Sequence, residues 1–230
     1  MKKNLTELVF ILDRSGSMGG LESDTIGGFN SLLKKQQEVE GECLLTTVLF
    51  DNQYELLHDR IDIRGTAEIT PDQYYTRGST ALLDAVGLTI KKISTAQKNT
   101  SEDFRPEKTL CVIITDGMEN SSREYGGRQI KEMIELQKKD NNWEFVFLGA
   151  NIDALETAEN MGIHRDYSAN YHANSKGVAM NFCAMEEGIK EMRTKGTFDA
   201  QCCKKINLNY ENEKDKKPTH TDDIPDGNKK

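Results

Sequence analysis

The sequence predicts an α/β sandwich built around a mostly parallel β-sheet, and two observations support this prediction. Residues 7–13 and 109–115 are near-continuous apolar runs, which are typical of central parallel strands buried on both faces. Other short apolar runs alternate along the chain with segments whose apolar residues recur at helical spacing. Strands that alternate with helices in this way indicate a parallel sheet with helices packed against it.

The first half of the chain begins this alternation. Residues 7–13 form the first strand, and a Gly/Ser loop separates it from a helix at about 24–40. Residues 43–50 form a second buried strand. A polar turn connects this strand to residues 54–61, which we interpret as its hairpin partner at an edge of the sheet.

The second half continues the alternation and then loses it. Its elements are, in chain order, a helix at about 80–97, a strand at 109–115, a helix that ends near Lys139, a strand at 143–149, a helix closed by Gly162, a candidate short strand at 163–169 and a helix at about 174–193. Residues from about 204 onward show no such periodicity and are rich in Lys, Asp, Asn and Glu. We therefore predict one domain over 1–203 and a disordered polar tail over 204–230, with a tail that orders on binding as the alternative.

Composition and charge argue against several classes of protein. The formal net charge of −8 disfavours non-specific nucleic-acid binding, which needs a basic surface. The apolar run near the start of the chain contains Glu7 and ends at Asp13, so it is too short for a signal peptide or a membrane span. The five cysteines are odd in number and show no CxxC spacing, which indicates a reducing compartment. We expect a cytoplasmic protein that binds neither nucleic acid nor a membrane.

Polar side chains occur at places that a parallel sheet brings to one edge. Asp13, Ser15 and Ser17 follow the first strand, Asp116 follows the second long buried run, and Thr80 stands at the start of a helix. Right-handed crossovers put the carboxyl ends of the parallel strands on the same edge, where ligands bind in such sheets. These residues offer only hard oxygen donors, which select Mg²⁺, Mn²⁺ or Ca²⁺ over zinc or copper. Two carboxylates this close repel each other unless a cation or a proton lies between them.

The motifs at these places carry a resemblance to a known family. The pattern D-x-S-x-S after the first strand, the Thr of a Gly-Ser-Thr loop and the Asp of Ile-Thr-Asp-Gly, in that order, resemble the metal-ion-dependent adhesion site of von Willebrand factor A domains. The resemblance covers about residues 5–195 and points to the cytoplasmic type found in bacteria and phages. It implies a Rossmann-like three-layer sandwich with helices on both faces of a six-stranded, mostly parallel sheet. One antiparallel edge strand is expected at 54–61.

The resemblance also implies a function and a role for each residue. Ser15, Ser17 and Thr80 would bind the metal through their hydroxyls, and Asp13 and Asp116 would bind it directly or through water. We expect Mg²⁺, with Mn²⁺ or Ca²⁺ as alternatives. In the family, an Asp or Glu of another protein often completes the metal shell, so the chain would be a protein-binding module and not an enzyme. Neutral hydroxyls with at most two carboxylates leave the cation electron-poor, which independently favours an anionic group from a partner.

Other interpretations of the same residues stay open. A Mg²⁺-dependent phosphatase or phosphotransferase of the haloacid-dehalogenase type would use Asp13 as its nucleophile, although Ser15 stands where such enzymes carry their acid/base Asp. Without a metal, the serines would form a turn, Thr80 would cap a helix and Asp116 would be an ordinary turn residue.

Further polar residues are expected near this edge or on the surface. We interpret Asp51, Glu119 and Asn120 as solvated loop residues, with contact to a partner as the alternative for Glu119 and Asn120. The four histidines have no partner at the spacing of a metal site or a catalytic triad. We therefore interpret them as structural or surface groups.

Overall fold

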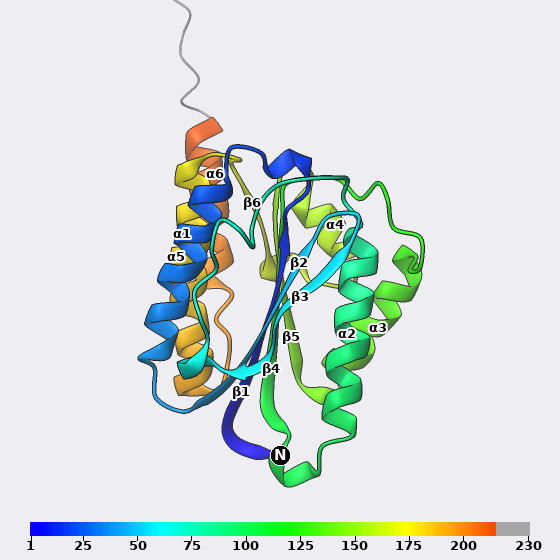
Figure 1. The fold of residues 1–230 in the computed structure, drawn as a ribbon, viewed down its shortest axis with the longest axis vertical. Helices are drawn as coiled ribbons and strands as arrows, with labels where there is room; N and C mark the ends of the chain where they lie inside the picture. Colours follow the sequence, from blue (N-terminus) through cyan, green and yellow to red (C-terminus); the bar gives the residue numbers. More distant parts are fainter. Residues whose placement is uncertain (215–230) are drawn as a thin grey trace, which may run out of the picture.

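The computed structural model describes residues 1–214 and places helices on both faces of a central sheet (Figure 1). The strands are β1 (Lys2–Asp13), β2 (Glu42–Phe50), β3 (Tyr54–Asp62), β4 (Pro106–Thr115), β5 (Trp143–Ala150) and β6 (Ser168–Tyr171). The α-helices are α1 (Glu22–Gln37), α2 (Leu82–Lys98), α3 (Gly127–Asn141), α4 (Ala154–Asn160), α5 (Ser175–Lys195) and α6 (Gln201–Lys214). Short 3₁₀ helices are η1 (Gly16–Met18), η2 (Ile63–Gly65), η3 (Glu102–Phe104) and η4 (Arg165–Tyr167).

The order of the strands places β1 in the interior of the sheet. The six strands lie in the order β3-β2-β1-β4-β5-β6. Every neighbouring pair is parallel except β2 with β3, which are antiparallel. The prediction of a mostly parallel sheet with one antiparallel edge strand is therefore confirmed. The chain builds outward from β1 to β3 and then places β4 on the other side of β1, so the strand order reverses between β1 and β4.

Each face of the sheet has its own apolar core, which explains the near-continuous apolar runs. Along β1, Leu8, Phe10 and Leu12 belong to the core that also contains residues of α1, α5 and α6. Val9 and Ile11 belong to the core that contains residues of α2, α3 and α4 on the opposite face (Figure 1). Alternate side chains of a strand point to opposite faces, and because both faces are covered here, the side chains on both faces are mostly apolar.

Helix α6 packs against the edge strand β6. Ile206 is buried in the same core as residues of α1 and α5. The side chain of Asn207 bonds to β6 in both directions: its Nδ2 donates to the Ser168 carbonyl at 3.0 Å, and its Oδ1 accepts from the Asn170 N–H at 2.9 Å. The helix thus covers backbone groups of a strand that has no further strand beside it.

This helix changes the predicted domain boundary. Residues 204–214 belong to α6, so the prediction of a disordered tail is wrong for this segment. The periodicity is weak there because a helix that covers one edge strand needs only a narrow apolar stripe. Residues 215–230, the rest of the predicted tail, lie outside the described residues. Within residues 1–214, no helix is long and apolar enough to cross a membrane.

Candidate metal centre

The carboxyl ends of β1 and β4 lie side by side where the strand order reverses. β1 ends at Asp13, and its parallel neighbour β4 ends at Thr115. Asp116 follows β4 directly and is therefore brought next to Asp13. The chain turns immediately after β1, because the Ser15 N–H donates back to Asp13 Oδ1 at 2.7 Å. The tertiary fold thus gathers the two carboxylates that the sequence separates by about a hundred residues.

Three hydroxyls from two loops form a chain beside these carboxylates. Ser15 Oγ lies 2.9 Å from Ser17 Oγ, and Thr80 Oγ1 donates to Ser15 Oγ at 3.0 Å. Thr80 reaches the serines because its loop is joined to the loop after β1, where the Gly16 N–H donates to the Gly78 carbonyl at 3.2 Å. Gly78 has a φ of +66°, a left-handed conformation that favours glycine.

Gly117 leaves the space in front of these hydroxyls open. A Cβ on this residue would lie 2.8 Å from Ser17 Oγ, 2.9 Å from Thr80 Oγ1 and 3.7 Å from Ser15 Oγ. The three hydroxyl oxygens therefore converge on one point beside the residue that follows Asp116. Glycine is required here because any side chain would fill that point.

The Asp13 carboxylate is buried and held by two hydrogen bonds. Its Oδ2 accepts from Thr115 Oγ1 at 2.6 Å, and its Oδ1 accepts from the Ser15 N–H. Burial raises the pKa of Asp13 to about 6, and the charge of Asp116 adds to the rise, whereas the bonds from Thr115 and Ser15 lower it. The environment therefore disfavours the ionised carboxylate unless a positive charge lies nearby.

The Asp116 carboxylate has even less support from the protein. It is 1% exposed, and neither of its oxygens makes a hydrogen bond of regular geometry to any residue of the described chain. Burial raises the pKa of Asp116, and the neighbouring Ser17 hydroxyl opposes part of that rise. A buried polar group without a partner is rare in native proteins, because it has lost its hydration without replacement.

The loop after β4 is bonded to the beginning of α2. Asn120 Oδ1 accepts from the Thr80 N–H at 2.9 Å, and the Asn120 N–H donates to the Thr80 carbonyl at 3.1 Å. Glu119 Oε2 accepts from the Leu83 N–H at 2.9 Å in the first turn of α2. In return, the Asp84 carboxylate accepts three N–H groups of the loop at 2.8 to 2.9 Å. These bonds hold the Thr80 hydroxyl and the loop that carries Gly117 in one arrangement.

These contacts add a role to those predicted for Glu119, which is half-buried, and Asn120, which is exposed. The sequence suggests solvated loop residues or contacts for a partner, whereas both side chains bind main-chain groups of the same molecule. The groups that they bind lie 36 and 40 residues away along the chain. No local pattern signals such a pairing, because it depends on how β4 and α2 are placed.

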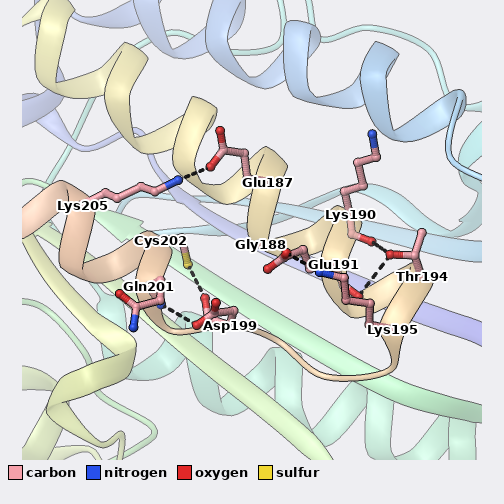
Figure 2. Close-up of a pocket in the computed structure, with 10 residues that line it drawn as sticks. All are labelled: Glu187, Gly188, Lys190, Glu191, Thr194, Lys195, Asp199, Gln201, Cys202 and Lys205. Carbon is pink, nitrogen blue, oxygen red and sulfur yellow. Dashed lines mark hydrogen bonds and ion pairs between the residues drawn. The ribbon is translucent and has the colours of Figure 1, made fainter.

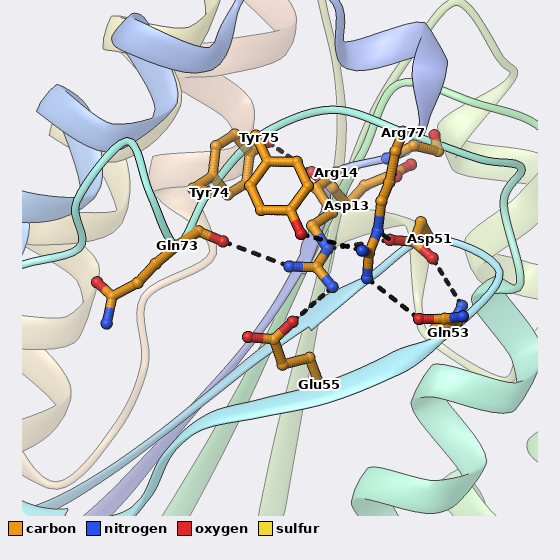
Figure 3. Close-up of polar contacts among 10 residues, drawn as sticks. Asp13, Arg14, Asp51, Gln53, Glu55, Gln73, Tyr74, Tyr75 and Arg77 are labelled. Carbon is orange, nitrogen blue, oxygen red and sulfur yellow. Dashed lines mark hydrogen bonds and ion pairs between the residues drawn. The ribbon is translucent and has the colours of Figure 1, made fainter.

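Asp51 differs from its predicted role, since it lies at the centre of a buried ion-pair cluster (Figure 3). Its Oδ2 accepts from Arg14 Nε at 3.0 Å and from Arg77 Nε at 2.7 Å. Arg14 is fully buried, and its Nη2 lies 2.6 Å from Glu55 Oε2. The ring of Tyr75 lies near both guanidinium groups, with its centroid 5.5 Å from Arg14 Cζ and 5.2 Å from Arg77 Cζ. The sequence analysis did not identify either arginine.

The described histidines take no part in this site. His58 Nδ1 lies 3.0 Å from Thr47 Oγ1 within the sheet, and the His172 ring bonds to a main-chain carbonyl of α6. His164 is exposed beside Asp166, while His220 lies outside the described residues. Within residues 1–214, no group of three or more His, Cys, Asp or Glu side chains is arranged to hold a metal. The donors gathered at the ends of β1 and β4 are instead two carboxylates with three hydroxyls.

A cavity of about 410 Å³ lies between α5 and α6, away from these loops (Figure 2). Four charged side chains on its walls form two ion pairs, Lys205 with Glu187 and Lys195 with Glu191. The Cys202 thiol donates to the Asp199 carbonyl at 3.0 Å. These groups are satisfied within the helices, in contrast to the carboxylate of Asp116.

Comparison with known proteins supports the architecture. No protein-family model and no curated protein matches this chain. Proximal thread matrix protein 1 from the mussel byssus, solved with a zinc-occupied MIDAS motif, matches with a TM-score of 0.55 and 12% identity over 80% of this chain and 46% of its own. A von Willebrand factor type A structure from Catenulispora acidiphila matches with a TM-score of 0.50 and 13% identity over 80% of this chain and 42% of its own.

A third solved structure is covered more fully. The manganese-loaded TRAP protein of Plasmodium vivax has a TM-score of 0.53 and 17% identity, with 78% of this chain and 73% of that chain covered. The chain described here spans slightly less than half the length of the mussel and Catenulispora structures. At these identities the likeness concerns the fold. Together with the strand order and the helices on both faces, it shows that this chain has the von Willebrand factor A fold.

Proposed function

We propose that this protein is a divalent-metal-dependent protein-binding module whose cation is held by Asp13, Ser15, Ser17, Thr80 and Asp116. The observation that carries the proposal is the Asp116 carboxylate, which is buried and has no regular hydrogen bond within the described residues. A buried charge without a partner is strongly unfavourable. A cation at the point where the three hydroxyls converge would supply the missing partner.

The choice of metal follows from the donor atoms. Carboxylate and hydroxyl oxygens suit Mg²⁺, Mn²⁺ and Ca²⁺, whereas nitrogen and sulfur donors suit zinc and copper. The mussel protein was solved with zinc at its motif and the Plasmodium vivax protein with manganese, which supports a divalent ion at an equivalent place here. We propose Mg²⁺ as the ion in this chain.

The protein's own groups leave room for a ligand from outside. Asp13 is oriented by Thr115 and by the Ser15 N–H, and Thr80 is oriented by Asn120. When bound, the cation supplies an electron-poor centre, because three of its proposed donors are neutral hydroxyls. An Asp or Glu of another protein would complete the shell without any bond being made or broken. We propose this as the mode of binding, in a cytoplasmic protein without nucleic-acid or membrane ligands.

The alternative, a phosphatase with Asp13 as nucleophile, has no specific observation in its favour. Both oxygens of Asp13 accept hydrogen bonds, and the side chain is 1% exposed, whereas a nucleophile needs an oxygen open to its substrate. Ser15 bonds to the other hydroxyls and is not an acid or a base of ordinary strength. We expect no hydrolysis of a generic phosphate ester in the presence of Mg²⁺.

Titration calorimetry with Mg²⁺ tests the metal site directly. The wild type should release or absorb heat on binding, and Asp116→Ala should not. Asp103→Ala is the matched control, because Asp103 is an exposed aspartate in η3 and should leave binding unchanged. Equal binding by all three proteins would overturn the assignment, and so would the absence of binding by a correctly folded wild type.

A second experiment tests the protein-binding role. A partner that copurifies from the native host in Mg²⁺ should dissociate when excess chelator is added, while circular dichroism reports an unchanged fold. Thr80→Ala should weaken the complex without unfolding the domain. If the affinity is the same with Mg²⁺ and with chelator, the metal does not bridge the two proteins.

A further inference from the structure

We infer that the surface around the metal site docks an acidic segment of another protein that carries an apolar side chain beside its metal-binding carboxylate. This inference rests on the proposed function and adds the chemistry of the partner. It is carried by Met118 on one side of the site and by Tyr75 with Arg77 on the other.

Met118 is an exposed apolar side chain on a well-held backbone. It follows Gly117 directly, and a Cβ on Gly117 would already touch the hydroxyls of Ser17 and Thr80. Its side chain is 71% exposed. The next two residues, Glu119 and Asn120, bind the start of α2, so the loop is already ordered before any partner arrives. Because the loop is ordered in advance, binding at Met118 does not carry the further entropy cost of ordering the backbone.

Tyr75 is an exposed aromatic ring that is also held in advance (Figure 3). It lies beside the guanidinium groups of Arg14 and Arg77, and Arg77 Nη1 donates to its hydroxyl at 3.0 Å. The segment is attached to the loop after β1, because the Arg77 N–H donates to the Arg14 carbonyl at 2.9 Å. The ring is nevertheless 43% exposed. Tyrosine, arginine and methionine are the side chains enriched at the centres of protein interfaces.

The strand order puts these two groups on opposite sides of the site. Arg77 is paired with Asp51, which follows β2, whereas Met118 lies in the loop after β4, and β1 runs between those two strands. Neighbouring strands are about 4.8 Å apart, so β2 and β4 are about 10 Å apart, which is roughly three residues of an extended segment. A short segment can therefore place one carboxylate at the metal and a neighbouring side chain on Met118 or Tyr75.

The ion-pair cluster beside the site is balanced in formal charge, two arginines with the carboxylates of Asp51 and Glu55, so it is the proposed cation that favours an acidic partner. Two buried or half-buried arginines, Arg14 and Arg77, share the single buried carboxylate of Asp51. Glu55 lies next to Arg14 with a side chain that is 44% exposed, where solvent screens its charge.

The remaining large apolar residues that are exposed in the described chain lie outside the loops of the site; they are Met1, Ile61, Phe104, Leu136 and Leu208.

Small carboxylic acids provide a direct test with defined probes. The probes are acetate, 4-methylpentanoate and the uncharged 4-methylpentanamide, each titrated in excess Mg²⁺ into protein with ¹³C-labelled methionine methyl groups. The Met118 methyl resonance, identified by its loss in Met118→Ala, should shift with both acids and not with the amide. The longer acid should bind at least about fourfold more tightly than acetate, since one buried methylene contributes about that factor.

Three variants separate the possible outcomes. In Tyr75→Ala/Met118→Ala the preference for the longer acid should fall towards one, and in Met118→Ala it should fall in part. Leu136→Ala removes another exposed apolar side chain, from α3, and should leave the preference unchanged. An unchanged preference in both Met118 variants would overturn the inference while leaving the metal site intact. If calorimetry detects no Mg²⁺ binding at all, the proposed function fails and the inference fails with it.

Discussion

Two buried carboxylates lie in or next to the interior strands β1 and β4, and they differ in how many hydrogen bonds the protein gives them. In the middle of β1, Glu7 is fully buried. Its carboxylate accepts hydrogen bonds from Arg60 Nε at 2.6 Å, Arg60 Nη2 at 3.2 Å and Gln97 Nε2 at 2.8 Å. Gln97 is itself satisfied, because its Oε1 accepts from Trp143 Nε1 at 3.0 Å. Just beyond the carboxyl end of β4, Asp116 is equally buried, and its oxygens have no regular hydrogen bond within the described residues.

We interpret this difference as the one between a structural carboxylate and a carboxylate available for the proposed cation. The two carboxylates are buried to the same extent, so burial does not distinguish them. The number of hydrogen-bond partners distinguishes them, because a buried charge without a partner in the protein needs a counter-charge from a ligand or a proton. Three substitutions test this interpretation, taken from the largest expected effect on stability to the smallest.

Glu7→Ala should give the largest effect, a loss of stability. It leaves the partly buried guanidinium of Arg60 and the buried amide of Gln97 without their partner, which costs about 3 kcal/mol. For a domain of this size the midpoint of thermal unfolding should fall by roughly 10 °C. Glu42→Ala is the control, because Glu42 pairs with Lys2 on the surface, where such pairs contribute about 0–1 kcal/mol. Similar melting temperatures for the two variants would contradict the structural role of Glu7.

Asp116→Asn should change stability in the opposite direction. Without metal, it removes an uncompensated buried charge, and we expect a gain of about 1–3 kcal/mol in the free energy of unfolding. Asp51→Asn is the matched control, since Asp51 is equally buried but is paired with two arginines, and it should destabilise the protein. Thermal unfolding in chelator measures both variants. If Asp116→Asn melts below the wild type, Asp116 has a partner in the metal-free protein, and the proposed difference between Asp116 and Glu7 is wrong.

Gly117→Ala should have the smallest effect on the metal-free protein and a clear effect on metal binding. The added methyl would lie within 3 Å of the Ser17 and Thr80 hydroxyls, and the resulting crowding should cost about 1 kcal/mol. It would also occupy the point on which the hydroxyls converge, so the rise in melting temperature that Mg²⁺ gives the wild type should disappear. Gly126→Ala is the control, because a Cβ there meets no other atom within 4 Å. A normal Mg²⁺ response in Gly117→Ala would place the metal elsewhere.

Much of the fold could be predicted from local patterns. The runs at 7–13 and 109–115 are apolar at nearly every position, and only a strand covered on both faces requires that. The antiparallel edge strand and the main helices also follow from periodicity, turn signals and the resemblance to a known family. Helix α6 was missed because Ile206 and its few buried neighbours form too narrow a stripe, and because Asn207 stabilises it through β6, a partner remote in sequence.

The features of the candidate site can likewise be divided into those that the sequence predicts and those that only the structure shows. The sequence by itself identified the five candidate oxygen donors and their order, because the motifs are local and each stands at the end of a strand or the start of a helix. Only the tertiary structure decided that Asp116 has no regular hydrogen bond within residues 1–214 while Asp51 has two arginine partners, and that Glu119 and Asn120 bind α2 and Thr80. Burial and pairing depend on which distant segments the strand order brings together, and a linear pattern contains no measure of that proximity.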